Sequence, residues 1–311
     1  MKKIKAFLQL IRWPNLAFIA ITQFLAVYCV LNPVFRSSPI KPNVSGWNFV
    51  LIGLSSILIA AAGYIINDYF DLNIDQINKP HKMVVEKIIP RRWAILWHSI
   101  LSFTAILIGF YVDYSSHIFL LGVSNAVCVL LLFVYSSTFK RKLLIGNVII
   151  SLLTAWVILV ICWCEYNHLA RLHNGLAAEK ILRILFLYAG FAFVVSLIRE
   201  VVKDMEDVEG DRRFFCNTMP IAWGINASKV FAGVWMIVLI ATLFVVQLYA
   251  LRLGWWWSVL YCVVLIIIPL IIALTKLYRA QRPEDYHKVS SLIKLIMLTG
   301  IISLIFFRIY A

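Results

Sequence analysis

The distribution of apolar residues limits this chain to a membrane fold. Hydrophobic residues make up 62% of its 311 residues and charged residues 14%, and the mean hydropathy is +0.89. An average soluble domain carries about 25% charged residues, and a helix that crosses a bilayer needs about 20 largely apolar residues. The sequence therefore predicts an all-α integral membrane protein with nine transmembrane helices. The nine apolar stretches lie at about 15–31, 48–66, 93–111, 118–136, 143–164, 181–198, 229–251, 254–275 and 291–309.

Nothing in the sequence divides the chain into separate domains. The segment from Asn32 to Gly46 contains three prolines and is a polar loop, and no other linker separates one part of the chain from another. We therefore expect one membrane domain over residues 1–311. The six cysteines lie mostly inside the apolar stretches and form no CxxC pair, so we expect small core residues rather than metal ligands or disulfide partners.

Positive charge indicates which side of the membrane each loop occupies. With the N-terminus in the cytoplasm, the loops on that side collect 22 of the 29 Lys and Arg residues, and the opposite side holds seven. Loops that flank spans carry more Lys and Arg on the cytoplasmic side. We therefore expect a multi-pass protein of the cell (inner) membrane, with its N-terminus cytoplasmic and its C-terminus on the opposite side. The net charge of +14 then reflects topology and contact with anionic membrane lipids, and no nucleic-acid partner is expected.

Two short clusters at the predicted cytoplasmic ends of helices hold nine of the fifteen Asp and Glu residues. Acidic residues this concentrated in a membrane protein indicate a functional site. Carboxylate oxygens suit Mg²⁺, which in proteins often also binds substrate phosphates. We therefore predict an Mg²⁺ site that receives a diphosphate at the cytoplasmic side. Each cluster places three aspartates at positions i, i+3 and i+7, which share one face if the backbone is helical: Asp68, Asp71 and Asp75, and Asp204, Asp207 and Asp211.

Basic residues beside the clusters can bind the phosphates of such a substrate. Aspartates alone would repel a diphosphate, so metal and basic groups must supply the positive field that binds it. Lys140 follows the fourth apolar stretch, Arg12 precedes the first, and Arg199 and Lys203 stand beside the second cluster. For Lys140 and Arg12, the positive-inside bias of membrane proteins is an equally good explanation.

Other ionisable residues near the clusters are expected to have no catalytic role. Glu206 and Glu209 lie off the face of the three aspartates, and we expect them to face solvent or to pair with Arg212 and Arg213. The six histidines are scattered without metal-ligand spacing, so histidine is not expected to bind the metal or to act as the catalytic base.

Four segments of the sequence resemble the UbiA-type intramembrane prenyltransferases. Residues 67–75 (N-D-x-x-D-x-x-x-D) are similar to the first signature of that family, and residues 204–211 (D-x-x-D-x-x-x-D) are similar to the second. Residues 135–140 (Y-S-S-T-F-K) resemble the tyrosine-to-lysine segment between the signatures, and residues 12–15 (R-W-P-N) resemble the opening element. Nine helices with cytoplasmic acidic loops are also the architecture of that family.

The resemblance implies a reaction and a set of site residues. Family members transfer an isoprenoid chain from its diphosphate to an acceptor, with Mg²⁺ as cofactor, after ionisation of the allylic C1–O bond. The implied metal ligands are Asp68, Asp71, Asp75, Asp204, Asp207 and Asp211. The implied catalytic residues are Asp68, Asp71, Asp204, Asp207 and Lys140. The implied substrate-binding residues are Asn67, Arg12, Asn15, Tyr135, Arg199 and Lys203.

The resemblance leaves the acceptor open: a lipid is favoured, an aromatic acid is the main alternative, and a haem- or chlorophyll-type acceptor is a third. Residues 199–211 look most like the family branch that adds geranylgeranyl to geranylgeranylglyceryl phosphate. Residues 78–87, however, depart from the Arg-Pro-rich stretch that follows the first signature in many members. The alternative is an aromatic acceptor of the hydroxybenzoate or naphthoate type, as in quinone or pigment biosynthesis. The phosphate of a lipid acceptor would be received by Lys82, Lys87, Arg91 or Arg92.

A function of another class, divalent-cation transport, would also place aspartates in or beside membrane helices. A transported ion must pass between sites on both sides of the membrane, whereas the charge bias predicts both clusters on the cytoplasmic side. Prenyl transfer is therefore the favoured function.

Overall fold

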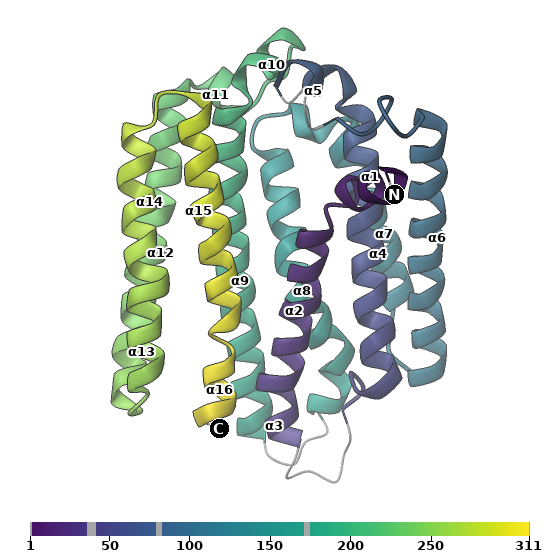
Figure 1. Ribbon diagram of the computed structural model, residues 1–311. Helices are drawn as coiled ribbons and strands as arrows, with labels where there is room; N and C mark the ends of the chain where they lie inside the picture. Colours follow the sequence, from purple (N-terminus) through teal and green to yellow (C-terminus); the bar gives the residue numbers. More distant parts are fainter. Residues whose placement is uncertain (1, 36–41, 79–82, 171–174, 311) are drawn as a thin grey trace.

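The computed structural model describes residues 2–35, 42–78, 83–170 and 175–310, and within them the chain is a bundle of helices (Figure 1). These residues contain one isolated β-bridge, between Val85 and Ile89. The helices are, in chain order, α1 (Lys2–Leu10), α2 (Trp13–Leu25), η1 (Ala26–Leu31), α3 (Asn32–Phe35), α4 (Gly46–Phe70), α5 (Leu72–Asn78), α6 (Arg91–Ser116), α7 (Leu121–Ser137), η3 (Phe139–Arg141), α8 (Ile145–Ala170), α9 (Gly175–Glu206), α10 (Val208–Arg213), α11 (Met219–Ala222), α12 (Ile225–Arg252), α13 (Trp256–Cys262), η4 (Val263–Ile267), α14 (Ile268–Arg279), α15 (Pro283–Ile302) and α16 (Ile305–Tyr310).

Eight helical segments of the described chain are long and apolar enough to cross a membrane. They coincide broadly with eight of the nine stretches predicted from the sequence. The remaining stretch forms α7, which has 17 residues. At about 1.5 Å per residue, α7 is about 25 Å long, somewhat less than the roughly 30 Å of a hydrocarbon core. The prediction of an all-α membrane protein is thus confirmed, whereas the count of nine spans stays a prediction.

A proline explains the π-helical turn η4 between α13 and α14. Pro269 has no N–H group and therefore cannot bond to the Leu265 carbonyl one turn earlier. Instead, the Thr299 hydroxyl of α15 donates a hydrogen bond to that carbonyl at 2.9 Å. Inside a bilayer, where water cannot take the place of the lost partner, such a side-chain donor is needed. This hydrogen bond therefore ties the irregular turn η4 to α15.

Helix α9 contributes to both large apolar cores of the bundle. Leu185 and Ala189 belong to a core shared with η1, α4 and α8. Val201 and Met205 belong to a second core shared with α12, α14 and α15. Figure 1 accordingly shows α9 between α8 on one side and α12 and α15 on the other. Because α9 ends in the second acidic cluster, that cluster is carried by a helix that packs on both sides.

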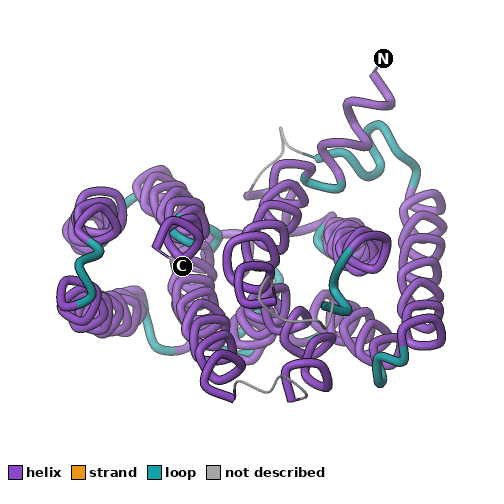
Figure 2. Tube along the Cα trace, turned by 90° about the horizontal axis from the view of Figure 1, so that it is seen from below, coloured by secondary structure: helices purple, strands orange, loops and turns teal. Residues whose placement is uncertain are grey.

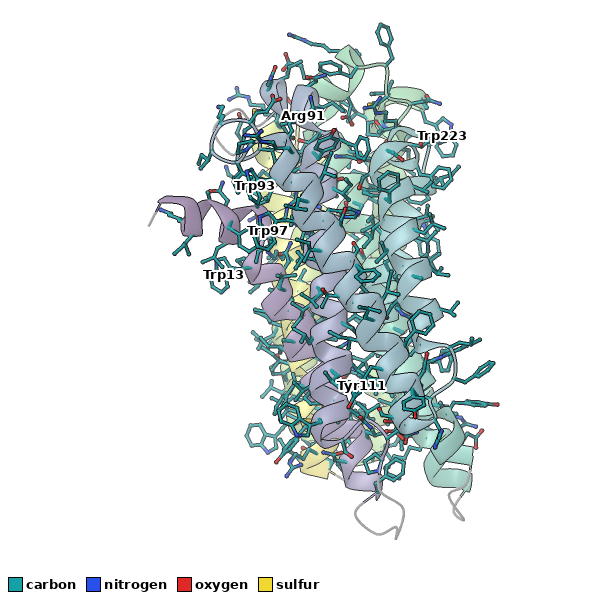
Figure 3. All side chains as sticks on the ribbon, turned by 90° about the vertical axis from the view of Figure 1, so that its right-hand side faces the viewer. Trp13, Arg91, Trp93, Trp97, Tyr111 and Trp223 are labelled. Atoms are coloured by element: carbon teal, nitrogen blue, oxygen red, sulfur yellow. The ribbon has the colours of Figure 1, made fainter. Side chains whose placement is uncertain are left out.

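The outer surface of the bundle suits a lipid environment. Most helices run along a common axis and are seen nearly end-on in Figure 2. Figure 3 shows Trp13, Trp93 and Trp97 in the upper half of the bundle, nearer α5 and α10, and Tyr111 nearer the lower end. All four side chains are exposed. Trp and Tyr concentrate at the two membrane interfaces, so these positions fit helices that cross a bilayer.

Candidate active site

The two acidic clusters have the same backbone form, a long helix that ends at the second aspartate. Asp71 follows α4 with φ −87° and ψ −1°, and Asp207 follows α9 with φ −97° and ψ 7°. A short helix, α5 or α10, resumes after each. The N–H group of the third aspartate still bonds to the carbonyl of the second, at 2.8 Å in the first cluster and 3.2 Å in the second. The expected single helical face is therefore interrupted, because the first aspartate lies on the long helix and the third on the short one.

The short helices α5 and α10 are joined through one side chain. The amide of Asn78 donates a hydrogen bond to the Asp207 carbonyl at 3.0 Å and accepts one from the Gly210 N–H at 2.9 Å. A Cβ atom at Gly210 would lie 2.5 Å from the Asn78 side chain, so a larger residue at position 210 would displace Asn78 from this contact. Both clusters therefore lie at the same end of the bundle (Figure 1). This arrangement disfavours a transport path between clusters on opposite sides.

A cavity of about 780 Å³ is lined by both clusters and extends between the membrane-spanning helices. Its apolar part includes Leu132, Phe191 and Leu243, and it reaches Trp255 and Phe307. Such a cavity can hold an apolar chain that ends in a charged head. The predicted site residues that line it are Arg12, Asn15, Asn67, Asp68, Asp71, Asp75, Tyr135, Lys140, Arg199, Lys203, Asp204 and Asp207, whereas Asp211 is buried in α10 and does not line it.

Arg12 is placed at the cavity by the backbone turn between α1 and α2. Its backbone lies in the left-handed region (φ 51°, ψ 53°), which costs about 1–2 kcal/mol for a residue other than glycine. The guanidinium donates a hydrogen bond to Asp68 at 2.8 Å and lies over the Tyr64 ring, 5.0 Å from its centroid. An ion pair and a cation–π contact therefore stabilise the strained turn and fix the direction of the side chain.

Lys140 reaches the cavity from the short turn η3, which the start of α8 approaches closely. A Cβ atom at Gly146 would lie 2.8 Å from the Phe139 carbonyl oxygen, 3.0 Å from Lys140 Cα and 3.1 Å from the Tyr135 ring. A larger residue at position 146 would therefore displace the turn. The segment from Tyr135 to Lys140, which the sequence marked as one motif, is positioned by this glycine.

The ammonium of Lys140 forms an ion pair with Asp71. The same carboxylate oxygen accepts a hydrogen bond from the Asn67 amide at 2.7 Å. Burial by itself lowers the pKa of Lys140, but Asp71, Tyr135 and Asp75 together raise this pKa above its ordinary value. Lys140 is therefore a fixed positive charge beside the first cluster.

Asp204 is held by a residue that the sequence interpretation missed. The amide of Asn147, on α8, donates a hydrogen bond to the Asp204 carboxylate at 2.7 Å. Asn147 lies inside the predicted span 143–164, and a polar residue there is a signal of function. The spacing of apolar residues could not show, however, which neighbouring helix it faces.

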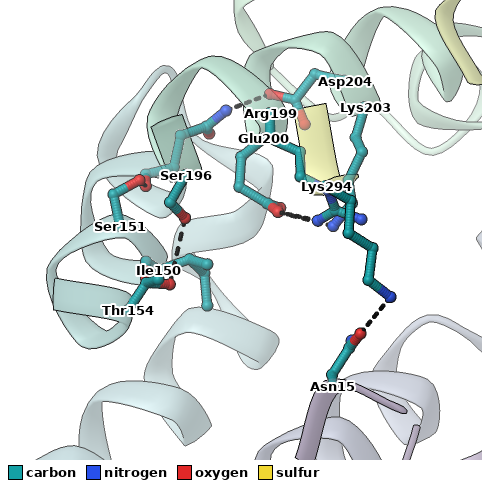
Figure 4. Close-up of polar contacts among 11 residues, drawn as sticks. Asn15, Ile150, Ser151, Thr154, Ser196, Arg199, Glu200, Lys203, Asp204 and Lys294 are labelled. Atoms are coloured by element: carbon teal, nitrogen blue, oxygen red, sulfur yellow. Dashed lines mark hydrogen bonds and ion pairs between the residues drawn. The ribbon is translucent and has the colours of Figure 1, made fainter. Parts of the chain in front are cut away.

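A second group of cations faces the cavity from α9 and α15 (Figure 4). Arg199 and Lys203 donate hydrogen bonds to the Glu200 carboxylate at 3.2 and 2.7 Å. Lys294, on α15, donates one to the Asn15 side-chain oxygen at 2.6 Å. Lys294 was also missed from the sequence, although it lies inside the predicted span 291–309, where an ionisable residue indicates function.

Glu206 and Glu209, the two other glutamates of the second cluster, differ in exposure and in their partners. Glu209 is exposed and accepts a hydrogen bond from Arg213 at 3.0 Å, so the predicted ion pair is confirmed. The prediction for Glu206 is wrong, because its side chain is 12% exposed, lines the cavity and contacts the His287 ring nitrogen at 2.9 Å. His287 belongs to α15, and the local sequence around Glu206 could not show that α15 packs there.

The chemistry of the donors suits a hard cation such as Mg²⁺. Carboxylate and amide oxygens are its preferred protein ligands. The Asn67 side-chain oxygen is buried and has no hydrogen-bond partner in the described ranges of the chain, although the amide nitrogen of the same side chain donates to Asp71. A buried acceptor without a partner is costly, and a cation beside Asp71 would satisfy it. In the part of the chain that the structure describes, no three Asp, Glu, His or Cys side chains form a complete metal-binding group.

Comparison with known proteins identifies the family. A model described as the UbiA prenyltransferase family matches residues 16–298, which include both acidic clusters. The chain belongs to this family. The resemblance inferred from the motifs is thereby confirmed. Among UbiA relatives, a digeranylgeranylglyceryl phosphate synthase from Methanothermobacter thermautotrophicus is 34% identical over 246 residues, which are 78% of this chain and 79% of that protein.

Solved structures of UbiA proteins have the same fold. A structure of a digeranylgeranylglyceryl phosphate synthase matches with a TM-score of 0.60 at 24% identity, over 98% of this chain and 99% of that chain. A UbiA homolog from Archaeoglobus fulgidus, bound to DMAPP and Mg²⁺, matches with a TM-score of 0.56 at 17% identity, over 96% of this chain and 98% of that chain. At these identities the likeness concerns the fold.

The contact between α5 and α10 leads to a prediction. Gly210→Ala should lower the rate of prenyl transfer by up to about 100-fold, because the added Cβ would move Asn78 and shift the two clusters relative to each other. The measurement is the initial rate of the purified variant in detergent. Glu209→Ala is the matched control, since that neighbouring side chain is 70% exposed. Equal rates for the two variants would show that this contact does not position the aspartates.

Proposed function

We propose that this protein transfers a geranylgeranyl group from its diphosphate to geranylgeranylglyceryl phosphate, forming digeranylgeranylglyceryl phosphate. The observation that carries the proposal is one cavity with two chemical characters: aspartates and cations from both clusters at one end, and apolar side chains along the rest. The acceptor is supported by sequence relation, because similar proteins from Methanosphaera stadtmanae and Methanothermobacter thermautotrophicus are named digeranylgeranylglyceryl phosphate synthases.

Mg²⁺ is the proposed cofactor. The Archaeoglobus fulgidus homolog of this fold binds it together with DMAPP, and the unpartnered oxygen of Asn67 fits a cation at the first cluster. When bound, Mg²⁺ neutralises the diphosphate and stabilises the charge on it as it leaves. Asp211 does not line the cavity and is proposed to support α10. The proposed ligands are the aspartates that do line it: Asp68, Asp71, Asp75, Asp204 and Asp207.

Lys140 and Arg12 are the proposed cationic contacts of the diphosphate, with Tyr135 beside them in the cavity wall. When the allylic C1–O bond breaks, both electrons pass to the diphosphate, and negative charge grows on its oxygens. A cation that is already in place stabilises this charge without reorganisation. The acceptor hydroxyl oxygen then forms a bond to C1 and releases its proton.

The apolar part of the cavity is proposed to hold the prenyl chains. Side chains such as Leu132, Phe191 and Leu243 offer no hydrogen-bonding groups to water. Keeping water away from the carbocation-like carbon favours attack by the acceptor over hydrolysis. Because the cavity lies between membrane-spanning helices, a donor and an acceptor with long prenyl tails can both be lipid-borne.

The experiment that tests this function identifies both substrates together. Purified protein in detergent with Mg²⁺ is given radiolabelled prenyl diphosphates of several lengths and three acceptors: geranylgeranylglyceryl phosphate, hydroxybenzoate and a naphthoate. We expect product from the glyceryl phosphate. Product from an aromatic acceptor instead would assign the protein to the alternative function in quinone or pigment biosynthesis.

In the same assay, Asp68→Ala, Asp207→Ala and removal of Mg²⁺ with EDTA should each abolish turnover, because metal and aspartates act together on the diphosphate. Glu179→Ala is the control, since that side chain is 53% exposed and pairs with Arg183. Size-exclusion profiles should be the same for all variants. Near-normal rates for either aspartate variant in saturating Mg²⁺ would contradict the metal assignment.

Lys140 and Lys142 form a matched pair of variants. Lys140→Gln removes a preorganised charge that contacts the leaving diphosphate, and losing one such contact costs about 10²–10³ in kcat. Lys142 is exposed and contacts the Phe139 ring, so Lys142→Gln should keep the wild-type kcat. Parallel measurements of kcat decide between a catalytic and a topological Lys140. Equal, near-wild-type values would leave it a topological charge.

We also propose a single membrane domain of nine spans, with α7 as the ninth, placed in the cell (inner) membrane. Its N-terminus is cytoplasmic, its C-terminus lies on the opposite side, and the active site faces the cytoplasm. The support is the charge bias, with 22 of 29 Lys and Arg residues on one side. The position of both clusters at one end of the bundle agrees with this orientation.

Cysteine labelling tests this orientation. All six native cysteines are free and buried, as predicted, so background labelling is low. An impermeant thiol reagent should label Lys87→Cys and Glu209→Cys from the cytoplasmic side and Ser115→Cys from the opposite side, because the first two positions lie near the clusters and the third at the far end of α6. Labelling of positions 87 and 209 from opposite sides would restore the transporter hypothesis.

A further inference from the structure

The cavity contains a group of cations beyond those assigned to the diphosphate. Arg199, Lys203 and Lys294 line it from α9 and α15. Arg12 and Arg199 lie close enough for their charges to act on both Lys203 and Lys294. The Glu200 carboxylate contacts two members of this group, Arg199 and Lys203. A net positive charge inside an apolar bundle is costly unless an anion accompanies it.

Two of these cations have donors that no carboxylate occupies. The Arg199 Nε atom is buried and has no hydrogen-bond partner among the described residues, while another nitrogen of the guanidinium contacts Glu200 at 3.2 Å. Lys294 contacts the neutral oxygen of Asn15 at 2.6 Å, and an ammonium has three N–H donors. Arg199 and Lys294 can therefore accept an anion without giving up an ion pair, whereas Lys140 would first have to leave its ion pair with an aspartate.

The neighbouring Asp204 does not complete the ion pairing of this group. Its carboxylate is bound by the Asn147 amide of α8 at 2.7 Å. Lys203 and Arg199 both donate hydrogen bonds to Glu200 instead. A guanidinium and an ammonium side by side form a typical phosphate site, since the guanidinium binds two phosphate oxygens and the ammonium supplies a further charge.

The proposed reaction requires a phosphate site close to the reacting carbon. In a glyceryl phosphate, the phosphate and the free hydroxyl are attached to the same three-carbon backbone, so the two groups stay within a few bonds of each other. The cation group meets this requirement, because Lys294 contacts Asn15, which is three residues from Arg12, and Arg12 contacts Asp68.

The basic residues first considered for the acceptor phosphate do not meet this requirement. Lys87, Arg91 and Arg92 do not line the cavity. Arg91 lies over the Tyr69 ring and 3.7 Å from Glu86, and its side chain is 50% exposed. The fourth candidate, at position 82, lies outside the described residues.

We propose that Arg199 and Lys294, assisted by Lys203, bind the phosphate of the acceptor. The acceptor is then anchored between α9 and α15, while the donor diphosphate lies among the aspartates with Lys140 and Arg12. This inference rests on the proposed function, and it makes α15 the helix that selects an acceptor with a phosphate over one without.

The test measures KM separately for geranylgeranylglyceryl phosphate and for geranylgeranyl diphosphate. Lys294→Gln should raise the acceptor KM about 10- to 100-fold, the effect of losing one charged hydrogen bond, and leave the donor KM unchanged. Lys294→Arg should restore most of the loss. Lys288→Gln is the matched control on the same helix, since Lys288 is exposed and does not line the cavity. Arg199→Gln should act in the same direction as Lys294→Gln.

Geranylgeranylglycerol, which lacks the phosphate, serves as a control acceptor. Wild type and Lys294→Gln should use this acceptor equally poorly, because the contact that distinguishes them is absent. Binding of the glyceryl phosphate in EDTA, without donor, should weaken in Lys294→Gln by the same factor as the rise in acceptor KM. This second measurement needs no turnover.

The possible outcomes test the acceptor phosphate site separately from the proposed prenyl transfer. Wild-type turnover of the glyceryl phosphate with an unchanged acceptor KM in Lys294→Gln would overturn the inference alone. An equal rise in the donor KM would assign the cations to the diphosphate and also overturn it. Absence of wild-type turnover with this acceptor would refute the proposed function, and in that case unchanged binding in Lys294→Gln would refute the phosphate site as well.

Discussion

Charge at one end of an apolar bundle is the constraint on which the rest of this structure depends. A carboxylate on a membrane-spanning helix is costly unless a donor meets it, and here the donors come from other helices. Asp68 is met from the turn before α2, Asp71 from η3 and Asp204 from α8. Asn78 then joins the ends of the two clusters. The contacts that offset the cost of burying these carboxylates therefore also hold the helices in place around the cavity.

The ion pairs at this site can be replaced by contacts to a metal ion and a diphosphate. Asp68 with Arg12 and Asp71 with Lys140 neutralise each other, so a metal ion would take over the carboxylates while a diphosphate takes over the cations. Each charge keeps a partner in such an exchange, which avoids the large cost of a buried charge left alone. Lys294 differs, because its partner is a neutral amide oxygen. It can gain an anion without an exchange.

The sequence predicted the helices and most of the cavity lining, but not how the site is held together. Apolar stretches locate the membrane-spanning helices because a helix in lipid needs about 20 largely apolar residues, and such a stretch is visible in the sequence. The ends of α4 at Asp71 and of α9 at Asp207 could not be predicted from the sequence. The short helices that follow them, α5 and α10, meet through Asn78, which is 129 residues from its partner Asp207. Asn147 and Lys294 are single polar residues in apolar stretches, and their spacing carries no information on which helix they face. Contacts between distant segments are therefore what sequence reasoning missed.

The two clusters share a backbone form but differ in electrostatics, and this difference gives the cavity its two sides. In the first cluster, two of the three aspartates, Asp68 and Asp71, form ion pairs with Arg12 and Lys140. In the second cluster the Asp204 carboxylate is held by a neutral amide, which satisfies its hydrogen bonding but not its charge. Arg199 and Lys203, on the same helix as Asp204, are directed towards Glu200 instead, and their two positive charges exceed the single charge of that carboxylate. In the proposed reaction, a metal ion would therefore be attracted between the clusters and the acceptor phosphate towards α15. This would keep the two phosphate-bearing ligands apart in one cavity while their apolar chains share the space between the helices.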